Sequence, residues 1–252
     1  MRPESFFSAV RFLTIIPIPE SWCGDESDFH KSPEWYPLVG LLIGLVMVVA
    51  DLIFCWLLPV PVASVLLLLV MIAVSGALHL DGLADSADAF FSSRGREKML
   101  EIMKDSRSGP MGVTAIVLVL LLKLMLLISL PDGWRWQAIL LMPLVGRCSL
   151  SVVSSWLPYA RQEGTAAFTN NSFNWSRVGI IFGVLFVITL SLLGGAGLFV
   201  VAILSLSLWL LGRYSLRKIG GFTGDTLGAT CELMELLPPL CVIILSQQGL
   251  MS

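Results

Sequence analysis

Three aspartates stand one helical turn apart in the segment HLDGLADSADAF, which covers residues 79–90. Asp81, Asp85 and Asp88 have the spacing i, i+4 and i+7, which places them within an arc of about 60° on one helix face. Like charges so close repel one another, and the penalty grows near a membrane. A divalent cation relieves that repulsion, and magnesium suits carboxylate oxygens while keeping positions for water and substrate phosphates. The pattern predicts a magnesium site for phosphoryl transfer, with these three aspartates as ligands.

The residues between the aspartates support a ligand site. Gly82, Ala84 and Ala87 are small and leave room for a bulky group beside the carboxylates. The alternative interpretation is an acidic helix end that is simply solvated. His79 lies on the opposite side of an unbroken helix, so we expect it to join the site only if the helix bends near Gly82.

A basic turn follows in the string KDSRSG, residues 104–109, directly before Pro110. Proline favours the first position of a helix, and the N-terminus of a helix attracts anions. Lys104 and Arg107 are therefore predicted to bind phosphate oxygens of a substrate. The alternative is that both are flanking charges that set the orientation of the chain in a membrane.

Further charged residues follow in apolar or glycine-rich surroundings. Arg147 falls inside an apolar stretch, where a charge is costly and functional by default. Arg161 follows the same stretch and is a second candidate for binding substrate, or else a topology anchor. The glycine-rich segment 220–228 contains Asp225. Glu232 follows seven residues later, so the two side chains could lie on the same face of a helix. These two carboxylates are predicted either to contact substrate or metal, or to hold the basic side chains in place.

The composition indicates that most of the chain lies in a lipid bilayer rather than in water. The 252 residues are 56% hydrophobic and 13% charged, a balance typical of a membrane protein, and the net charge of −2 gives no reason to expect nucleic acid. The five cysteines form no zinc or disulfide pattern. We expect an all-α, polytopic membrane helical bundle that forms one integral membrane domain over residues 1–252, with about seven transmembrane helices. The predicted spans are 36–58, 60–79, 110–130, 136–157, 178–193, 196–212 and 229–245.

The N-terminal 19 residues lack the features of a cleaved signal peptide. They predict an amphipathic helix on the membrane surface instead. The apolar side is formed by Phe6, Phe7, Val10, Leu13 and Thr14.

The distribution of lysine and arginine predicts the orientation. With seven spans, the N-terminal arm and the loops 80–109, 158–177 and 213–228 carry most basic residues on one side, and the other side receives Arg135 alone. Basic loops stay in the cytoplasm. The motifs described above therefore face the cytoplasm.

These residues resemble a known family. The string of residues 79–90, followed by RGREKMLEIMKDSRSGPMG at 94–112, is similar to the cobalamin synthase family, whose members are adenosylcobinamide-GDP ribazoletransferases. The resemblance also covers FLTIIPIP at 12–19, YPLVG at 36–40, YARQEG from residue 159 and GFTGDTLGA from residue 221. The sequence departs from the family pattern at Ser86, Ala89 and Ser108. None of these is one of the charged residues predicted for the site.

The resemblance implies the final stage of vitamin B12 nucleotide-loop assembly. It implies condensation of adenosylcobinamide-GDP with α-ribazole, or its 5′-phosphate, to give adenosylcobalamin or its 5′-phosphate and GMP, with Mg²⁺ as cofactor. A ribazole hydroxyl attacks phosphorus, and such transfers depend on positioning and charge neutralisation. Asp88 and Asp105 are candidates for the general base, followed by His79.

Two other functions remain open from the sequence. A lipid-forming CDP-alcohol phosphotransferase shares the Asp81-Gly82 start, but its motif continues with alanine and arginine where Asp85 and Ser86 stand. A membrane transporter would place its site at the midplane between repeats, and the sequence shows no repeat. The expected location is the bacterial inner membrane, with multiple passes through the lipid bilayer. Whether the chain forms a homo-oligomer, or associates with other cobalamin-pathway enzymes, is left open.

Overall fold

The structure is a computed structural model that describes residues 2–105, 107–161 and 175–250. The described chain is helical, with one isolated β-bridge between Tyr159 and Phe222. The α-helices are α1 (Pro3–Leu13), α2 (Glu26–Lys31), α3 (Tyr36–Leu57), α4 (Val60–Ser75), α5 (Leu78–Phe90), α6 (Arg96–Ile102), α7 (Pro110–Ser129), α8 (Arg135–Trp156), α9 (Trp175–Leu193), α10 (Ala196–Ile219), α11 (Gly224–Met234) and α12 (Leu237–Gln247). Short 3-10 helices cover Glu20–Trp22, Ser32–Glu34 and Asp132–Trp134.

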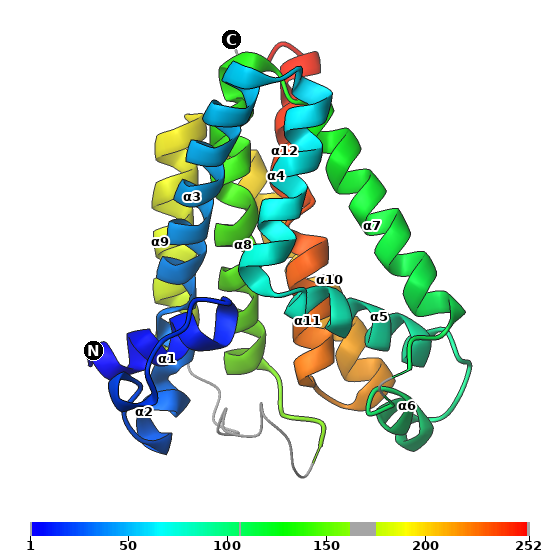
Figure 1. The fold of residues 1–252 in the computed structure, drawn as a ribbon. Helices are drawn as coiled ribbons and strands as arrows, with labels where there is room; N and C mark the ends of the chain where they lie inside the picture. The colour runs from blue at the N-terminus through cyan, green and yellow to red at the C-terminus, as the bar shows by residue number, and fades with distance from the viewer. Residues whose placement is uncertain (1, 106, 162–174, 251–252) are drawn as a thin grey trace.

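The helices are long and apolar enough for a polytopic membrane bundle, as predicted. Among the described residues, six helical segments meet the length and hydropathy of a membrane span. The α4–α5 pair supplies a seventh crossing if it is counted as one broken span. Figure 1 shows the N-terminus near the end of the bundle that carries α5 and α6, and the C-terminus at the opposite end.

Helix α8 is the centre of the bundle, since all of its membrane-spanning window is buried. Helix α3 packs closely against it through two glycines. A Cβ atom at Gly40 would lie 2.6 Å from the Pro143 carbonyl oxygen, and one at Gly44 would lie 2.6 Å from the Leu140 carbonyl oxygen. Small residues of this kind let membrane helices approach closely. Helix α8 can therefore carry polar side chains that are covered by neighbouring helices on every side.

A sharp bend separates α4 from α5. The helices meet at 88°, and both Gly76 and Ala77 have a φ of 58°, in the left-handed region. The predicted span 60–79 is therefore too long, because the crossing helix ends at Ser75. Helix α5 instead runs along one end of the bundle, as Figure 1 shows. This bend moves the aspartates of α5 out of the crossing and onto the end of the bundle.

The predicted amphipathic N-terminal helix is present as α1, but protein covers much of its apolar side. Val10 and Leu13 are buried. The ring of Phe6 lies 5.4 Å from that of Trp35, and the ring of Phe12 lies 6.1 Å from that of Tyr36, measured between centroids. The expectation that this face lies on lipid is corrected, because α1 packs on the start of α3 and closes one side of the bundle end.

A buried ion pair holds the opposite end of the bundle. Arg135 donates to both carboxylate oxygens of Asp51, at 2.8 and 2.7 Å, and to the Ser64 hydroxyl at 3.2 Å. It also donates to the carbonyl oxygen of Leu127. These contacts join α3, α4, α7 and α8, so the single basic residue predicted for this side has a role in packing.

Candidate active site

Close packing of α5 against α11 brings distant acidic residues together. A Cβ atom at Gly82 would lie 2.7 Å from the carbonyl oxygen of Asp225, and one at Gly228 would lie 3.1 Å from the carbonyl oxygen of His79. Glycine at these positions allows the two backbones to approach. As a result, Asp81 on α5 and Asp225 on α11 line the same cavity.

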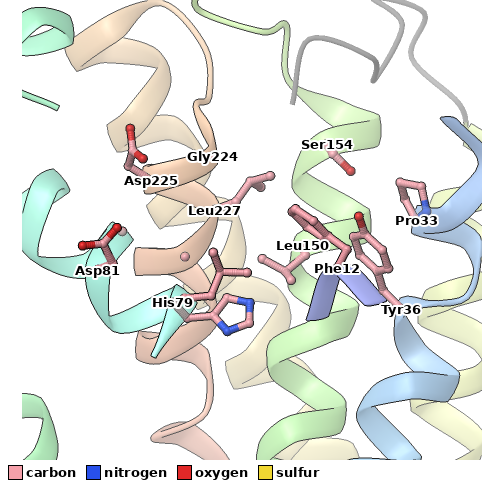
Figure 2. Close-up of a pocket in the computed structure, with 13 residues that line it drawn as sticks. Phe12, Pro33, Tyr36, His79, Asp81, Leu150, Ser154, Gly224, Asp225 and Leu227 are labelled. Atoms are coloured by element: carbon pink, nitrogen blue, oxygen red, sulfur yellow. The ribbon is translucent and has the colours of Figure 1, made fainter. Parts of the chain in front are cut away.

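This bundle-end cavity encloses about 130 Å³ and opens to solvent. Figure 2 shows α5 and α11 on one side, and α8 with the aromatic residues near α1 and α3 on the other. Its lining consists of Phe12, Pro33, Tyr36, Leu78, His79, Asp81, Gly82, Leu150, Ser154, Gly224, Asp225, Leu227 and Gly228.

Asp85 lies beside this cavity, close to other carboxylates. It is half-buried on α5, while Asp81 is exposed. Burial raises the pKa of Asp85 to about 7, and the carboxylates of Asp81 and Asp225 add to the rise. Such a shift means that the ionised form of the carboxyl group is destabilised unless a cation compensates its charge. The acidic end of the cavity is therefore suited to a cationic or metal-bound ligand.

Asp88 has a different environment from the other two aspartates. Its Oδ2 accepts a hydrogen bond from the Gly109 N–H at 2.6 Å, and its Oδ1 accepts one from the Gly112 N–H at 2.9 Å. The carboxylate thus satisfies backbone donors at the N-terminus of α7 that have no partner within that helix. Its predicted roles as metal ligand and general base remain predictions, but both of its oxygens are engaged in joining α5 to α7.

Arg161 joins the cavity to a second, open groove. Its guanidinium contacts Asp225 at 2.7 Å. On its other side lies the Arg161 groove, which Lys104 also lines. The groove is lined by Arg96, Glu97, Leu100, Glu101, Lys104, Ala160 and Arg161. Two predicted phosphate-binding residues therefore share one groove, next to the acidic end of the cavity.

Arg107 is not part of this groove in the structure. Its side chain is exposed and pairs with Asp105 at 2.8 Å. Hydrogen bonds from Arg107 lower the pKa of Asp105 to about 2. A carboxylate with such a low pKa is a weak proton acceptor, so this pair gives little support to Asp105 as the general base.

Arg147 and Glu232 belong to a buried ion network rather than to the cavity wall. Lys123 donates to Glu232 at 2.6 Å and to Glu235 at 2.5 Å, and Arg147 donates to Glu235. Each side chain is at most 7% exposed. Two cations and two carboxylates balance in charge, as burial requires. The network joins α7, α8 and α11, and it therefore holds the helix that carries Asp225.

His79 reaches the cavity without the predicted bend at Gly82. Helix α5 is continuous from residue 78 to residue 90, and its turn lies earlier, at Gly76 and Ala77. The imidazole is 3% exposed, and its Nδ1 atom has no hydrogen-bond partner among the described residues. The imidazole lies on the side of α5 away from Asp81 (Figure 2), as the helix spacing predicts, and it lines the cavity because other helices enclose that side as well. Its predicted catalytic role stays a prediction.

The sequence did not indicate the apolar wall of the cavity. Phe12, Tyr36, Leu150 and Leu227 come from four different helices or their flanks and carry no chemistry of their own. Phe12 and Tyr36 begin strings that carry the family resemblance, at residues 12–19 and 36–40, and Leu227 lies in the string that begins at residue 221. This resemblance was the only available signal.

Replacing Gly82 by alanine is expected to lower the melting temperature and kcat, because the new Cβ must push the backbone of Asp225 away. Overpacking of this kind costs about 1–3 kcal/mol. The matched control is Gly179→Ala in α9, where no atom lies within 4 Å of the added Cβ. Thermal unfolding of both variants in detergent checks this, and equal melting temperatures would contradict the close packing of α5 on α11.

Comparison with known proteins assigns the chain to a family. The cobalamin-5-phosphate synthase family matches residues 5–243 of the chain. Proteins named adenosylcobinamide-GDP ribazoletransferase are similar over most of their length. That of Geotalea daltonii is 39% identical, over 92% of this chain and 94% of its own, and that of Acetivibrio thermocellus is 40% identical, over 90% and 92%. That of Pseudomonas paraeruginosa is 42% identical, over 92% and 94%. No solved structure matches the chain. Since the match extends over nearly the whole chain and includes the residues of the cavity, the protein belongs to the cobalamin-5-phosphate synthase family.

Proposed function

We propose that this protein condenses adenosylcobinamide-GDP with ribazole, or with its 5′-phosphate, and releases GMP. The relatives named above are ribazoletransferases that act on adenosylcobinamide-GDP. The observation that carries the proposal is the junction at Asp225, where an acidic cavity meets a groove lined by Lys104 and Arg161. A diphosphate placed at this junction has basic side chains on one side and room for an acceptor on the other.

The reaction breaks a phosphoanhydride bond and forms a phosphate ester bond. A ribose hydroxyl oxygen of ribazole forms a bond to the phosphorus attached to cobinamide, and the bond from that phosphorus to the bridging oxygen of the diphosphate breaks. GMP leaves with the bridging oxygen, and the hydroxyl proton passes to a carboxylate at the acidic end of the cavity. Arg161 and Lys104 neutralise phosphate oxygens as charge moves onto the leaving group.

Magnesium fits the acidic end of the cavity. No three His, Cys, Asp or Glu side chains within residues 2–105, 107–161 and 175–250 are placed to ligate one ion by themselves. Magnesium commonly binds through one or two carboxylates and completes its shell with waters and substrate phosphates. We therefore propose that Asp81 and Asp85 hold the ion, with Asp225 close by. When bound, the ion supplies charge stabilisation to the diphosphate.

The cavity is proposed to face the cytoplasm of a bacterial cell, with the chain in the inner membrane. The basic residues of α6 and of the loop before α7 stand at the cavity end of the bundle, as Figure 1 shows for these elements. At the other end, Arg135 is buried in its pair with Asp51. The excess of basic residues at the cavity end favours a cytoplasmic position for it.

The test is a condensation assay on protein purified into lipid nanodiscs. With adenosylcobinamide-GDP, ribazole and Mg²⁺, we expect release of GMP and formation of cobalamin in equal amounts. Chelation with EDTA is expected to reduce turnover at least 100-fold, and added Mg²⁺ to restore it. If neither substrate is consumed while CDP-diacylglycerol is, or if vesicles take up substrate unchanged, the proposed function is wrong.

A further inference from the structure

The bundle-end cavity has two ends of opposite character. Asp81 and Asp225 lie at the end formed by α5 and α11. The other end is apolar and aromatic, where the rings of Phe12 and Tyr36 lie 6.1 Å apart with their planes inclined by only 18°. Figure 2 shows the side chain of Leu150 between these rings and the side of the cavity that carries His79. A ligand that fills this space is therefore flat and apolar at one end and polar at the other.

One polar atom interrupts the apolar end. The imidazole of His79 is buried, lines the cavity, and has an Nδ1 atom with no hydrogen-bond partner among the described residues. Figure 2 shows the ring on the side of α5 that faces α8 rather than beside Asp81. A buried polar atom without a partner is destabilising, so a ligand that offers it a hydrogen bond binds more tightly.

The size and charge of the cavity restrict its occupant. The cavity encloses about 130 Å³, which leaves no room for a corrin ring with its side chains and suits a small ring system. No lysine or arginine is among the residues that line it in the described chain, and residues 162–174 contain none. Basic side chains line the Arg161 groove instead. Phosphates therefore belong to the groove and an uncharged aromatic group belongs to the cavity.

We infer that the apolar end of the cavity is the base subsite of the nucleoside acceptor. It takes a flat, apolar heteroaromatic base of the benzimidazole class between the Phe12–Tyr36 pair and the leucines Leu150 and Leu227. His79 forms a hydrogen bond with a ring nitrogen of that base. The inference rests on the proposed function for the identity of the acceptor. It adds that this wall selects the base, since apolar walls disfavour bases with exocyclic polar groups.

The test fills the subsite. Leu227 is only partly buried, so Leu227→Trp can extend into the cavity without overpacking the helix interface. We expect the KM for ribazole to rise at least tenfold, while the KM for adenosylcobinamide-GDP and the kcat at saturation stay within twofold. The matched control is Leu240→Trp, at a partly exposed position of α12 outside the cavity, with both KM values unchanged.

A second variant tests the hydrogen bond. His79→Leu is expected to raise the KM for ribazole and to reduce the preference for ribazole over the corresponding adenine nucleoside. Melting temperatures of all variants identify any that fail to fold. If His79→Leu fails, Leu227→Trp with its intact imidazole still decides the matter.

Direct binding separates failure of this inference from failure of the proposed function. Equilibrium dialysis of ribazole against the wild-type protein and Leu227→Trp requires no turnover. Binding that Leu227→Trp removes supports the subsite, even if no condensation is detected. Condensation with an unchanged KM for ribazole in folded Leu227→Trp overturns the subsite and leaves the proposed function standing. Absence of binding together with absence of condensation overturns both.

Discussion

Replacement of Asp85 by asparagine is expected to reduce kcat by about 100–1,000-fold without loss of stability. The change removes one negative charge from a site where Asp81 and Asp225 already oppose ionisation of Asp85. Loss of this repulsion leaves the melting temperature unchanged or higher, because like charges on one helix destabilise it. A variant that is at least as stable as the wild type yet inactive is typical of a residue kept for function.

The measurement combines the condensation assay with thermal unfolding in the same detergent. Asp132→Asn is the control, since Asp132 is exposed and lies in the turn before α8, at the opposite end of that helix from Ser154 and the cavity. A higher Mg²⁺ concentration is expected to recover part of the activity of Asp85→Asn if the two other carboxylates still bind the ion. Turnover within threefold of the wild type in Asp85→Asn would remove the acidic end of the cavity from the mechanism.

The second large effect is expected for Lys123→Met. Lys123 is buried in α7 and contacts both Glu232 and Glu235, so its removal leaves Arg147 to balance two carboxylates. Breaking a buried ion pair by removing one partner costs about 3–5 kcal/mol. We expect most of the protein to be lost during membrane insertion or purification, and the remainder to melt at a much lower temperature.

A double variant tests whether charge balance is the cause. In Lys123→Met/Glu232→Gln, Arg147 and Glu235 remain as one neutral pair, and much of the lost stability is expected to return. Yield and melting temperature of the two single variants and the double variant complete the cycle. Additive losses would show that the network does not act as a unit. A stable but inactive double variant would instead give Glu232 a role with substrate, as its sequence position first suggested.

The acidic end of the cavity and the buried ion network are expected to differ in their tolerance of substitution. Asp81 is exposed and has no ion-pair partner among the described residues, so substitution there removes a group that the fold does not use. Glu235 is 1% exposed and is held by two basic side chains. Mutations at the first kind of position separate activity from stability, whereas mutations at the second kind change both together.

Local patterns in the sequence were enough for the type of fold and the main acidic element. A run of about 20 apolar residues must form a helix in lipid, because its backbone groups find no other partners there. The predicted stretches match α3 and α7 to within one residue, whereas the stretch 196–212 ends seven residues before α10, and the stretch 229–245 begins inside α11 and continues into α12. The string of residues 79–90 predicted a helix with aspartates on one face, and α5 covers all of these positions. The pattern did not predict the bend that precedes α5.

The end of the second crossing could not be predicted, because it depends on a turn that the hydropathy pattern hides. Residues 60–79 are mostly apolar, yet the helix turns by 88° at Gly76 and Ala77. Ala77 adopts a left-handed conformation that alanine rarely takes, so the surrounding contacts must favour it. The Ile15 N–H, which donates to the Val74 carbonyl oxygen at 2.9 Å, is one such contact.

By itself, the sequence determined that this chain is a helical membrane protein with an acidic element and basic turns at one end, because hydropathy, helical period and charge are properties of neighbouring residues. Only the tertiary structure decided the partners of each charge. It paired Asp225 with Arg161, assigned Asp88 to the amides of α7, and buried Arg147 and Glu232 together with Lys123. These choices depend on which helices lie side by side, and helix packing is set by small residues and shape far along the chain rather than by the spacing of the charged residues themselves.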